Sequence, residues 1–411
     1  MNKKKLLLFF IVITQFSFAQ NDTSTPYSLF GLGVENKTAT GGLTGLGNTG
    51  IAQNNAEEIN IYNPANLGNI QQKSFLYEFG INGMYSTLKT DKISENTNDY
   101  NISHIAMAFP IKKNFGMSLG LLPYTKVGYD IDIENTIEGS TQEYLSRITG
   151  SGGLNSFYWA SGFKIKEKLS LGLDISYLFG SINQETQIYY ESLVSITDVN
   201  YYKGFKFKAG LQYSLIKKEN KEFTLGAIIE LPTSLIGDQT RNSYKESSSG
   251  VQLIIDEEIE NELDNFELPF LFGFGITTML NKSITTSFDY KKLNWNDTNQ
   301  FQNNERYTNQ SIYAFGLEYL PTRNSKYWDN VKYRFGMNYN TGFLSISDQK
   351  IDSYFASVGL GMPLSDKAKL NIAYSYGREG TIGNSLVQEN FHKLTINLSF
   401  IGDWFNKGKY Y

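Results

Sequence analysis

The sequence contains no cysteine and only two histidines among its 411 residues. An exported protein without cysteine uses neither disulfide bonds nor thiolate metal sites. The histidines, His104 and His392, belong to predicted strands that point them to opposite faces, so they cannot share a site. No Gly-x-Ser-x-Gly or His-Glu-x-x-His motif is present. These absences argue against an enzyme and predict no cofactor.

Excess positive charge and long hydrophobic runs are missing as well. The net charge is −4 and the pI is near 5.5, which argues against nucleic acid as a partner. An apolar run at 6–13 follows three lysines and precedes the small residues Ser17 and Ala19. This pattern is typical of a secretory signal peptide over 1–19, with a mature chain that starts at Gln20. No later run is long enough for a transmembrane helix.

What the sequence has instead is alternation, most clearly at 394–400. Leu394, Ile396, Leu398 and Phe400 share one face of a strand there, and the residues between them are polar. The mean hydropathy of −0.34 hides this pattern, because polar residues dilute the apolar ones. A closed barrel with its apolar face outward crosses a membrane with every backbone group paired. A water-soluble β-sandwich would also alternate, but it would not need so many strands.

The pattern predicts an all-β fold: a 14-stranded antiparallel transmembrane β-barrel over 74–400. Tyr (28) and Phe (28) are abundant enough to form aromatic girdles at both membrane interfaces. Short turns alternate with mostly longer polar connections, which places both chain ends in the periplasm. We expect strands near 74–86, 101–110, 115–130, 154–165, 169–182, 203–216, 223–231, 268–280, 284–295, 310–320, 331–342, 353–364, 370–377 and 391–400.

Charged residues of the predicted strands support the barrel. A lysine or arginine that faces lipid near the middle of the bilayer costs about 2–4 kcal/mol. We therefore expect the charges to take the parity of the lumen. All ten that we tested do so: Glu78, Lys126, Asp174, Lys206, Lys208, Glu230, Asp289, Glu318, Lys332 and Arg334.

Residues 20–73 do not resemble barrel strands and are rich in glycine. We predict that they fold into the lumen as a plug (hatch) that includes Phe30, Asn63, Pro64 and Ala65. Irregular backbone at membrane depth is tolerated where protein buries it. The alternative is a flexible periplasmic tail, although a free tail would not need the apolar residues of this segment.

Pro123 lies in the middle of a predicted strand, whereas the other seven prolines fall elsewhere. Proline lacks an N–H and bends a strand, so within a sheet it is expected at an edge or a bulge. We expect a break in the wall here. It is either a harmless bulge or a side opening between lumen and bilayer formed by Gly120, Leu122, Pro123 and Gly128.

These features together resemble the FadL/TodX family of outer-membrane transport proteins (OMPP1), in its Bacteroidota branch. The resemblance rests on a plug with Asn63-Pro64-Ala65, on fourteen strands and on the interrupted third strand, and it covers the mature chain. It implies a plug that gates a hydrophobic ligand pocket and a lateral exit at strand three. Residues 401–411 depart from the usual end at a terminal aromatic, and we expect them to form a periplasmic tail.

The largest predicted loop, 232–267, contains apolar residues at helical spacing. Ile255, Ile259, Leu263 and Phe266 alternate with acidic residues and predict an amphipathic helix. Such a helix either helps to dock a ligand outside the barrel or packs on the barrel rim. The spacing of an EF-hand is absent, so we predict no metal.

Two functions agree with the sequence. The first is passive uptake of small hydrophobic molecules, fatty-acid-like or aromatic, through a pocket lined by residues such as Leu76, Met84, Leu122 and Ile228. The second is a non-transporting subunit of an outer-membrane protein secretion or assembly complex. In both cases we expect an integral protein of a Gram-negative outer membrane. Its partners would be lipid and lipopolysaccharide, a hydrophobic ligand, and other outer-membrane or periplasmic proteins.

Overall fold

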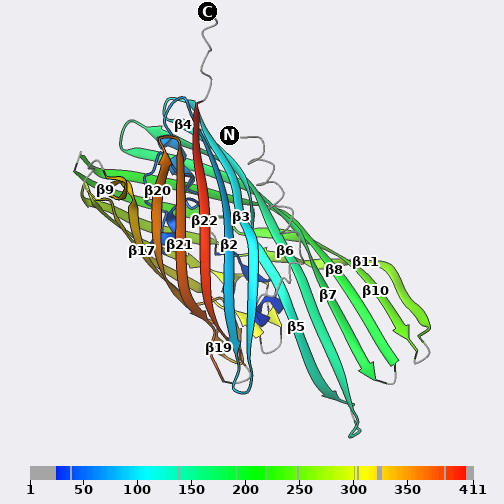
Figure 1. Cartoon of the computed structure of the whole chain (residues 1–411). Helices are drawn as coiled ribbons and strands as arrows, with labels where there is room; N and C mark the ends of the chain where they lie inside the picture. Colours follow the sequence, from blue (N-terminus) through cyan, green and yellow to red (C-terminus); the bar gives the residue numbers. More distant parts are fainter. Residues whose placement is uncertain are drawn as a thin grey trace, which may run out of the picture.

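A computed structural model describes residues 25–403 apart from 38, 138, 191, 219, 248–249, 300, 303–304, 322–325 and 384–385. The fold is a closed barrel of fourteen antiparallel wall strands (Figure 1). The continuous wall strands are β2 (Ser74–Lys89), β3 (Ser94–Lys112), β6 (Glu143–Ile165), β7 (Leu169–Tyr190), β8 (Ser192–Lys218), β13 (Ile284–Leu293), β16 (Gln310–Tyr319), β17 (Lys332–Asn340), β20 (Ser353–Ser365), β21 (Ala368–Glu379) and β22 (Gln388–Asp403).

Three further wall strands each consist of two consecutive segments. They are β4 (Phe115–Pro123) with β5 (Thr125–Thr136), β9 (Lys221–Glu230) with β10 (Thr233–Glu246), and β11 (Gln252–Leu268) with β12 (Leu271–Asn281). The barrel closes where the first and last wall strands pair, from Ser74↔Asp403 to Lys89↔Gln388. β22 thus continues three residues past Phe400, and 404–411 lie outside the described residues, as does the predicted signal peptide.

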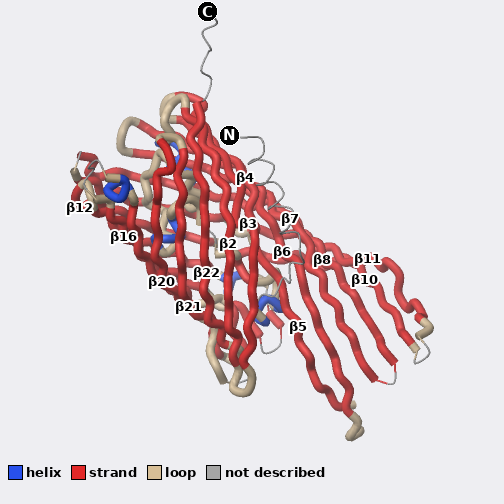
Figure 2. The backbone as a smooth tube through the Cα atoms, viewed as in Figure 1, coloured by secondary structure: helices blue, strands red, loops and turns tan. Residues whose placement is uncertain are grey.

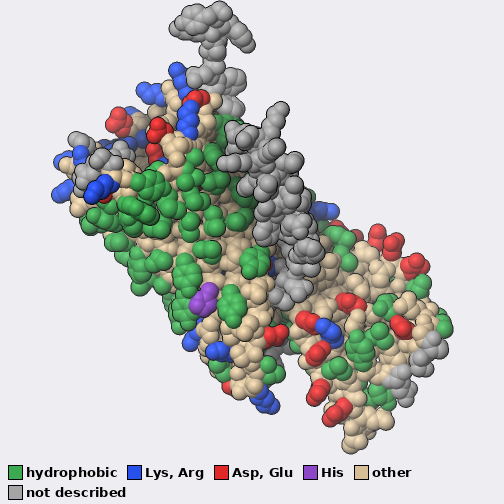
Figure 3. All heavy atoms as spheres, viewed as in Figure 1, with side chains coloured by type: hydrophobic (Ala, Val, Ile, Leu, Met, Phe, Trp, Pro, Cys, Tyr) green, Lys and Arg blue, Asp and Glu red, His purple; other side chains and the backbone are tan. Residues whose placement is uncertain are grey.

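The orientation of the wall side chains confirms the predicted barrel. Leu394 and Phe400 are 45% and 43% exposed on the outer surface, whereas Thr395 and Asn397 are buried inside. Figure 3 shows hydrophobic side chains covering much of the outer wall. Glu78, Asp174, Asp289 and Arg334 are buried in the lumen, and other predicted lumen charges pair there: Lys206 and Lys208 with Glu230, and Lys332 with Glu318.

The predicted long connections are largely wrong, because the strands continue through them. β7 and β8 are joined through residue 191 alone, and β2 and β3 are joined by 90–93. Figure 2 shows the longest of these strands projecting well beyond the rest of the barrel. Polar sequence marks where the wall leaves the membrane, but a hairpin still pairs more backbone groups than a loop does.

The predicted helix in the largest loop is also wrong. Ile255, Ile259, Leu263 and Phe266 belong to strand β11, which pairs with β10 throughout. Register shifts occur between Leu235 and Gly237 and between Arg241 and Ser243 of β10. Each shift adds a residue on β11. Bulges therefore gave the apolar residues of a strand the spacing of a helix.

The sequence suggests that Pro123 alone interrupts the wall, but two other prolines interrupt it as well. Pro232 separates β9 from β10, and Pro269 separates β11 from β12. The sequence places Pro232 at the start of the predicted loop 232–267 and Pro269 at the start of the strand predicted near 268–280, so neither lies in the middle of a predicted strand. The three prolines mark where strands three, seven and eight change course, since each lacks the N–H that a continuous ladder requires.

The described N-terminal residues, 25–37 and 39–73, lie within the barrel and are called the inner segment below. They form η1 (Pro26–Leu29), β1 (Val34–Glu35), η2 (Leu43–Leu46) and η3 (Pro64–Asn69). η2 packs on β16, β17, β20 and β21, while η3 packs on β4, β6, β7 and β8. No helix among the described residues is long and apolar enough to span a membrane.

The remaining elements are short and lie in the connections of the last third of the chain. They are η4 (Trp295–Asp297), β14 (Phe301–Gln302), β15 (Glu305–Tyr307), η5 (Tyr327–Asn330), β18 (Leu344–Ile346) and β19 (Gln349–Lys350). β14, β15, β18 and β19 form a small separate sheet.

Candidate functional site

Asn63, Pro64 and Ala65 begin the helix η3 of the inner segment. The Asn63 side chain accepts a hydrogen bond from the Ala65 N–H (3.0 Å), and Pro64 occupies the first helical position. Both are standard ways to start a helix. The Asn63 amide also donates to the Ile51 carbonyl (2.7 Å) and to the Leu211 carbonyl of β8 (3.1 Å). One side chain therefore shapes the segment and ties it to the wall.

Two wall glycines allow the inner segment to approach closely. A Cβ atom at Gly172 of β7 would lie 2.3 Å from the Ala65 nitrogen. A Cβ atom at Gly336 of β17 would lie 1.9 Å from the Gly47 nitrogen. Any side chain at these positions would displace the segment, so the wall is shaped to hold it.

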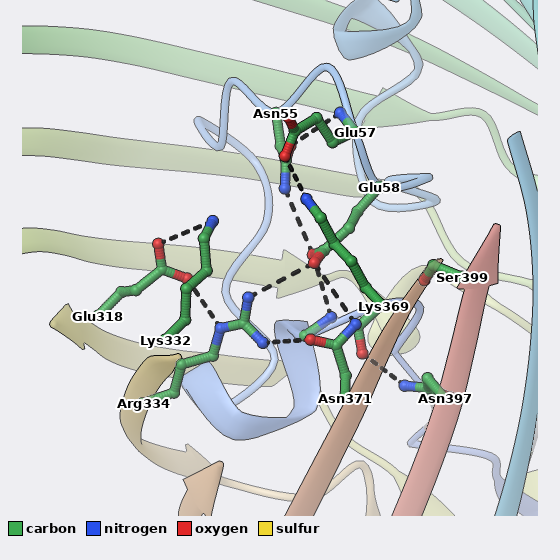
Figure 4. A network of polar contacts seen from close by, with 12 residues as sticks. Asn55, Glu57, Glu58, Glu318, Lys332, Arg334, Lys369, Asn371, Asn397 and Ser399 are labelled. Atoms are coloured by element: carbon green, nitrogen blue, oxygen red, sulfur yellow. Dashed lines mark hydrogen bonds and ion pairs between the residues drawn. The ribbon is translucent and has the colours of Figure 1, made fainter. Parts of the chain in front are cut away.

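A buried polar network joins the inner segment to β16, β17 and β21 (Figure 4). The Arg334 guanidinium donates to Glu318 (2.8 Å) and to Asn371 (2.6 Å), and its Nη2 lies 3.5 Å from a Glu58 carboxylate oxygen. Lys332 pairs with Glu318 at 3.3 Å, and Lys369 pairs with Glu57 of the segment. Two wall strands, β17 and β21, thus supply the cations that neutralise two carboxylates of the segment.

Glu58 remains ionised in spite of its burial. Burial by itself would raise the pKa of Glu58, but Arg334, with Lys332 and Lys369 nearby, holds the pKa below its usual range. The Glu58 carboxylate also accepts hydrogen bonds from the Gly42 N–H and the Asn55 amide. A buried charge with these partners fastens the segment only while it stays ionised.

Asp289 of β13 also fastens the inner segment. One oxygen of its carboxylate accepts hydrogen bonds from the Gly50 N–H (2.6 Å) and the Ile51 N–H (2.9 Å). Glu78 of β2 accepts a bond from the Ile59 N–H (2.8 Å) in the same way. The segment is therefore held from several sides of the barrel by wall carboxylates.

The wall is interrupted at Pro123. The ladder between β3 and β4 ends at the pair Ile105↔Leu121, and beyond it no pairing between β3 and β5 occurs among the described residues. The Tyr124 N–H instead donates to the Leu154 carbonyl of β6 (2.7 Å). The third strand is thereby drawn toward the fourth and away from the second.

The inner segment and two charged side chains of the wall occupy part of this interruption. β1 pairs with the start of β5 through Val34↔Lys126 and Glu35↔Thr125. The Lys126 ammonium lies 2.6 Å from the Asp99 carboxylate of β3. An ion pair therefore joins β3 to β5 at a place where backbone hydrogen bonds do not.

Three cavities lie in sequence inside the barrel. A cavity of about 470 Å³ at the base of the projecting strands, called the outer cavity below, is lined by Phe30, Leu263, Phe266 and Tyr307. An apolar cavity of about 200 Å³ shares Phe266 and Tyr307 with it and also contacts Leu122 and Ile228. The shared residues show that the two cavities adjoin at the Phe266 and Tyr307 rings, whose centroids lie 6.4 Å apart.

The third cavity, of about 560 Å³, lies beside the wall interruption. It shares Pro123 and Thr125 with the apolar cavity and is lined by Met84, Asp99 and Lys126. The three cavities thus extend from the end of the barrel that carries the projecting strands to the place where β3 and β5 are not paired.

The structure separates the predicted site residues into two groups. Phe30, Leu122, Pro123, Leu263 and Phe266 line the cavities. Others lie elsewhere. Gly120 is paired with Ala106 of β3, Gly128 is hydrogen-bonded to Ser28, Leu76 packs in a separate core cluster, and Ile255 and Ile259 are 55% and 42% exposed.

An aromatic cluster and a charged group at the apolar cavity were not predicted from the sequence. Trp295, Tyr307 and Phe343 contact one another with ring centroids 4.9–5.1 Å apart. Tyr307 and Phe343 come from connections that have no recognisable pattern, and Trp295 is the last residue of the strand predicted near 284–295. Lys206, Lys208 and Glu230 line the same cavity. Their lumen parity was the signal that could have placed them there.

Solved structures of low sequence identity share this fold. The toluene transporter TodX of P. putida matches with a TM-score of 0.62 at 15% identity, over 91% of this chain and all (100%) of that one. A Pseudomonas aeruginosa FadL homologue matches with a TM-score of 0.62 at 14% identity, over 90% of this chain and 100% of that one. The CymD monoaromatic hydrocarbon channel matches with a TM-score of 0.60 at 16% identity, over 91% of this chain and 99% of that one. No curated protein matches the sequence.

The protein is therefore an outer-membrane β-barrel with a FadL-like fold. A family model described as BamG matches residues 1–411, so the chain belongs to the BamG family.

Proposed function

We propose that this barrel takes up small hydrophobic molecules passively and releases them sideways into the membrane. The observation that carries the proposal is the series of three adjoining cavities, which ends where β3 and β5 are unpaired. Both ends of the mature chain would be periplasmic. The projecting end would face the outside of the cell, in contact with lipopolysaccharide.

A ligand would first bind at Phe30, Leu263 and Phe266 in the outer cavity. It would then pass the constriction between Phe266 and Tyr307 into the apolar cavity, where burial of apolar surface stabilises it by about 25 cal/mol per Å². The inner segment blocks the straight path along the barrel axis and leaves the gap beside Pro123 as the exit. TodX is a toluene transporter and CymD is a monoaromatic hydrocarbon channel, and ligands of that size or fatty-acid-like molecules suit these cavities.

The test is uptake by liposomes that contain the purified barrel. Pro123→Ala supplies the missing N–H and lets β5 pair with β3, so uptake of a fluorescent fatty acid should fall several-fold while binding persists. Pro363→Ala is the matched control, since Pro363 lies in β20 beside a turn and away from the gap. Uptake at the wild-type rate by Pro123→Ala, or no saturable binding by the wild type, would refute the proposal.

A second candidate function is a non-transporting subunit of an outer-membrane protein secretion or assembly complex. The observation that favours it is the fastening of the inner segment, because Arg334, Asp289 and Glu78 all hold it from the wall. A barrel that does not transport has no need for an inner segment that moves, so a firmly fastened segment agrees with this role. Affinity purification from native membranes separates the two candidates: large partners in fixed stoichiometry support the subunit, and recovery of the barrel alone opposes it.

A further inference from the structure

The wall beyond the three proline interruptions forms a sheet with two free edges. β5, β6, β7, β8, β10 and β11 pair in this order, and Figure 1 shows them projecting away from β2 and β3. β5 pairs with β6 and, at two residues only, with β1. β11 pairs with β10 alone among the described strands. We call this part the projecting sheet.

The β11 edge of the projecting sheet is strongly acidic. Its 17 residues contain no lysine or arginine, and no ion pair among the described residues involves its carboxylates. Figure 3 shows acidic side chains gathered over the projecting end of the molecule. The acidic residues of β11 are Asp256, Glu257, Glu258, Glu260, Glu262, Asp264 and Glu267.

Large apolar side chains are exposed along the same strand. Leu253, Ile254 and Ile255 are 66%, 62% and 55% exposed, and Ile259 is 42% exposed. They belong to none of the core clusters of the described residues. Natural edge strands are usually short or carry lysine or proline, which prevents pairing with another chain. β11 is long and carries neither lysine nor proline, and its remaining protections are its bulges and its carboxylates, which would attract a basic segment.

We propose that the free edge of β11 binds a basic, extended segment of a partner protein by strand addition. Backbone hydrogen bonds along the edge would supply affinity, and lysine or arginine opposite the carboxylates would supply specificity. A second copy of β11 is disfavoured, since seven carboxylates would then face seven others. The β5 edge is less suited, because it is shorter and Arg147 already pairs with its Asp130.

The test uses the full-length barrel in detergent micelles and a fluorescent 12-residue peptide of alternating lysine and valine. We expect saturable binding that weakens with salt and slows hydrogen exchange of the β11 amides. Glu258→Gln/Glu260→Gln/Glu262→Gln should weaken binding at least ten-fold. The matched control, Asp130→Asn/Asp132→Asn/Glu134→Gln on the β5 edge, should change it less than two-fold. Heat-modifiable migration of each variant on gels verifies that the barrel is folded.

Four outcomes would overturn the proposal. The first is that the peptide shows no saturable binding, and the second is that a peptide with the same charge and two central prolines binds equally well. The third is that the β5 control variant loses as much binding as the β11 variant, and the fourth is that protection from hydrogen exchange appears outside β11. This inference goes beyond hydrophobic uptake, which the β11 variant should leave unchanged. Failure here and failure of Pro123→Ala to reduce uptake are therefore separate results.

Discussion

Asp99 of β3 and Lys126 of β5 form an ion pair of 2.6 Å across a part of the wall where no backbone ladder joins their strands. Both side chains are mostly buried, with 9% and 20% exposed. The pair therefore lies in a medium that screens charge less than water does. It takes the place of the hydrogen bonds that the interruption at Pro123 removes.

Asp99→Asn should weaken this connection and leave the Lys126 ammonium without its anion. We expect the free energy of unfolding to fall by about 1–3 kcal/mol, as for other buried polar groups that lose a partner. Urea unfolding in detergent measures it. The double variant Asp99→Asn/Lys126→Met should regain part of the loss, because no unpaired cation remains. Equal stability of all three proteins would show that the pair contributes nothing.

Arg334→Met should be more damaging, since it removes the cation between Glu58 and Glu318. Loss of one partner from a buried pair costs about 3–5 kcal/mol. Protease cleavage within the inner segment should also accelerate, because Arg334 fastens this segment to β17. Lys369→Met is the matched control: its partner Glu57 is 47% exposed, so we expect a cost of at most about 1 kcal/mol. Similar losses in both variants would contradict this ranking.

The barrel could be predicted from the sequence because the membrane imposes a strict alternation. Residues such as Leu394 and Asn397 have no acceptable orientation except outward and inward. Beyond the membrane this constraint ends, and both faces of a strand can be polar. The sequence therefore predicts loops where β6 to β8 continue and where the projecting sheet lies.

Pro123 could be identified because its strand continues in the membrane on both sides. Pro232 and Pro269 interrupt the wall in the same way, but the sequence places Pro232 in a predicted loop and Pro269 at the start of a predicted strand, so neither stands out. The contacts of Asn63 with Ile51 and Leu211 depend on backbone carbonyls. Side-chain patterns carry no information on such partners, so only the position of the motif could be predicted.

The attachment of the inner segment should depend on pH through Glu58. Its pKa is lower in the folded protein than in the unfolded chain, so the stabilisation is present above the usual glutamate pKa of about 4.3. It is lost as the pH falls through the lowered value. Proteolysis of the inner segment should thus accelerate in acid. Glu58→Gln should remove this part of the pH dependence, and an unchanged profile in that variant would assign the effect to other groups.

Phe266 and Ile259 belong to one predicted docking group, yet they should differ in function. Phe266 is 7% exposed at the constriction and contacts the Tyr202 and Tyr307 rings at centroid distances of 6.3 and 6.4 Å, whereas Ile259 is 42% exposed on β11. Phe266→Ala removes a buried aromatic side chain and should cost about 3–5 kcal/mol of stability. It should also widen the passage between the outer and apolar cavities and speed ligand exchange several-fold. Ile259→Asn should leave the rate of ligand exchange within two-fold of the wild type and should leave the stability unchanged. Stopped-flow fluorescence of a bound fatty acid measures the exchange, and equal effects of the two substitutions would refute the assignment of the constriction to Phe266.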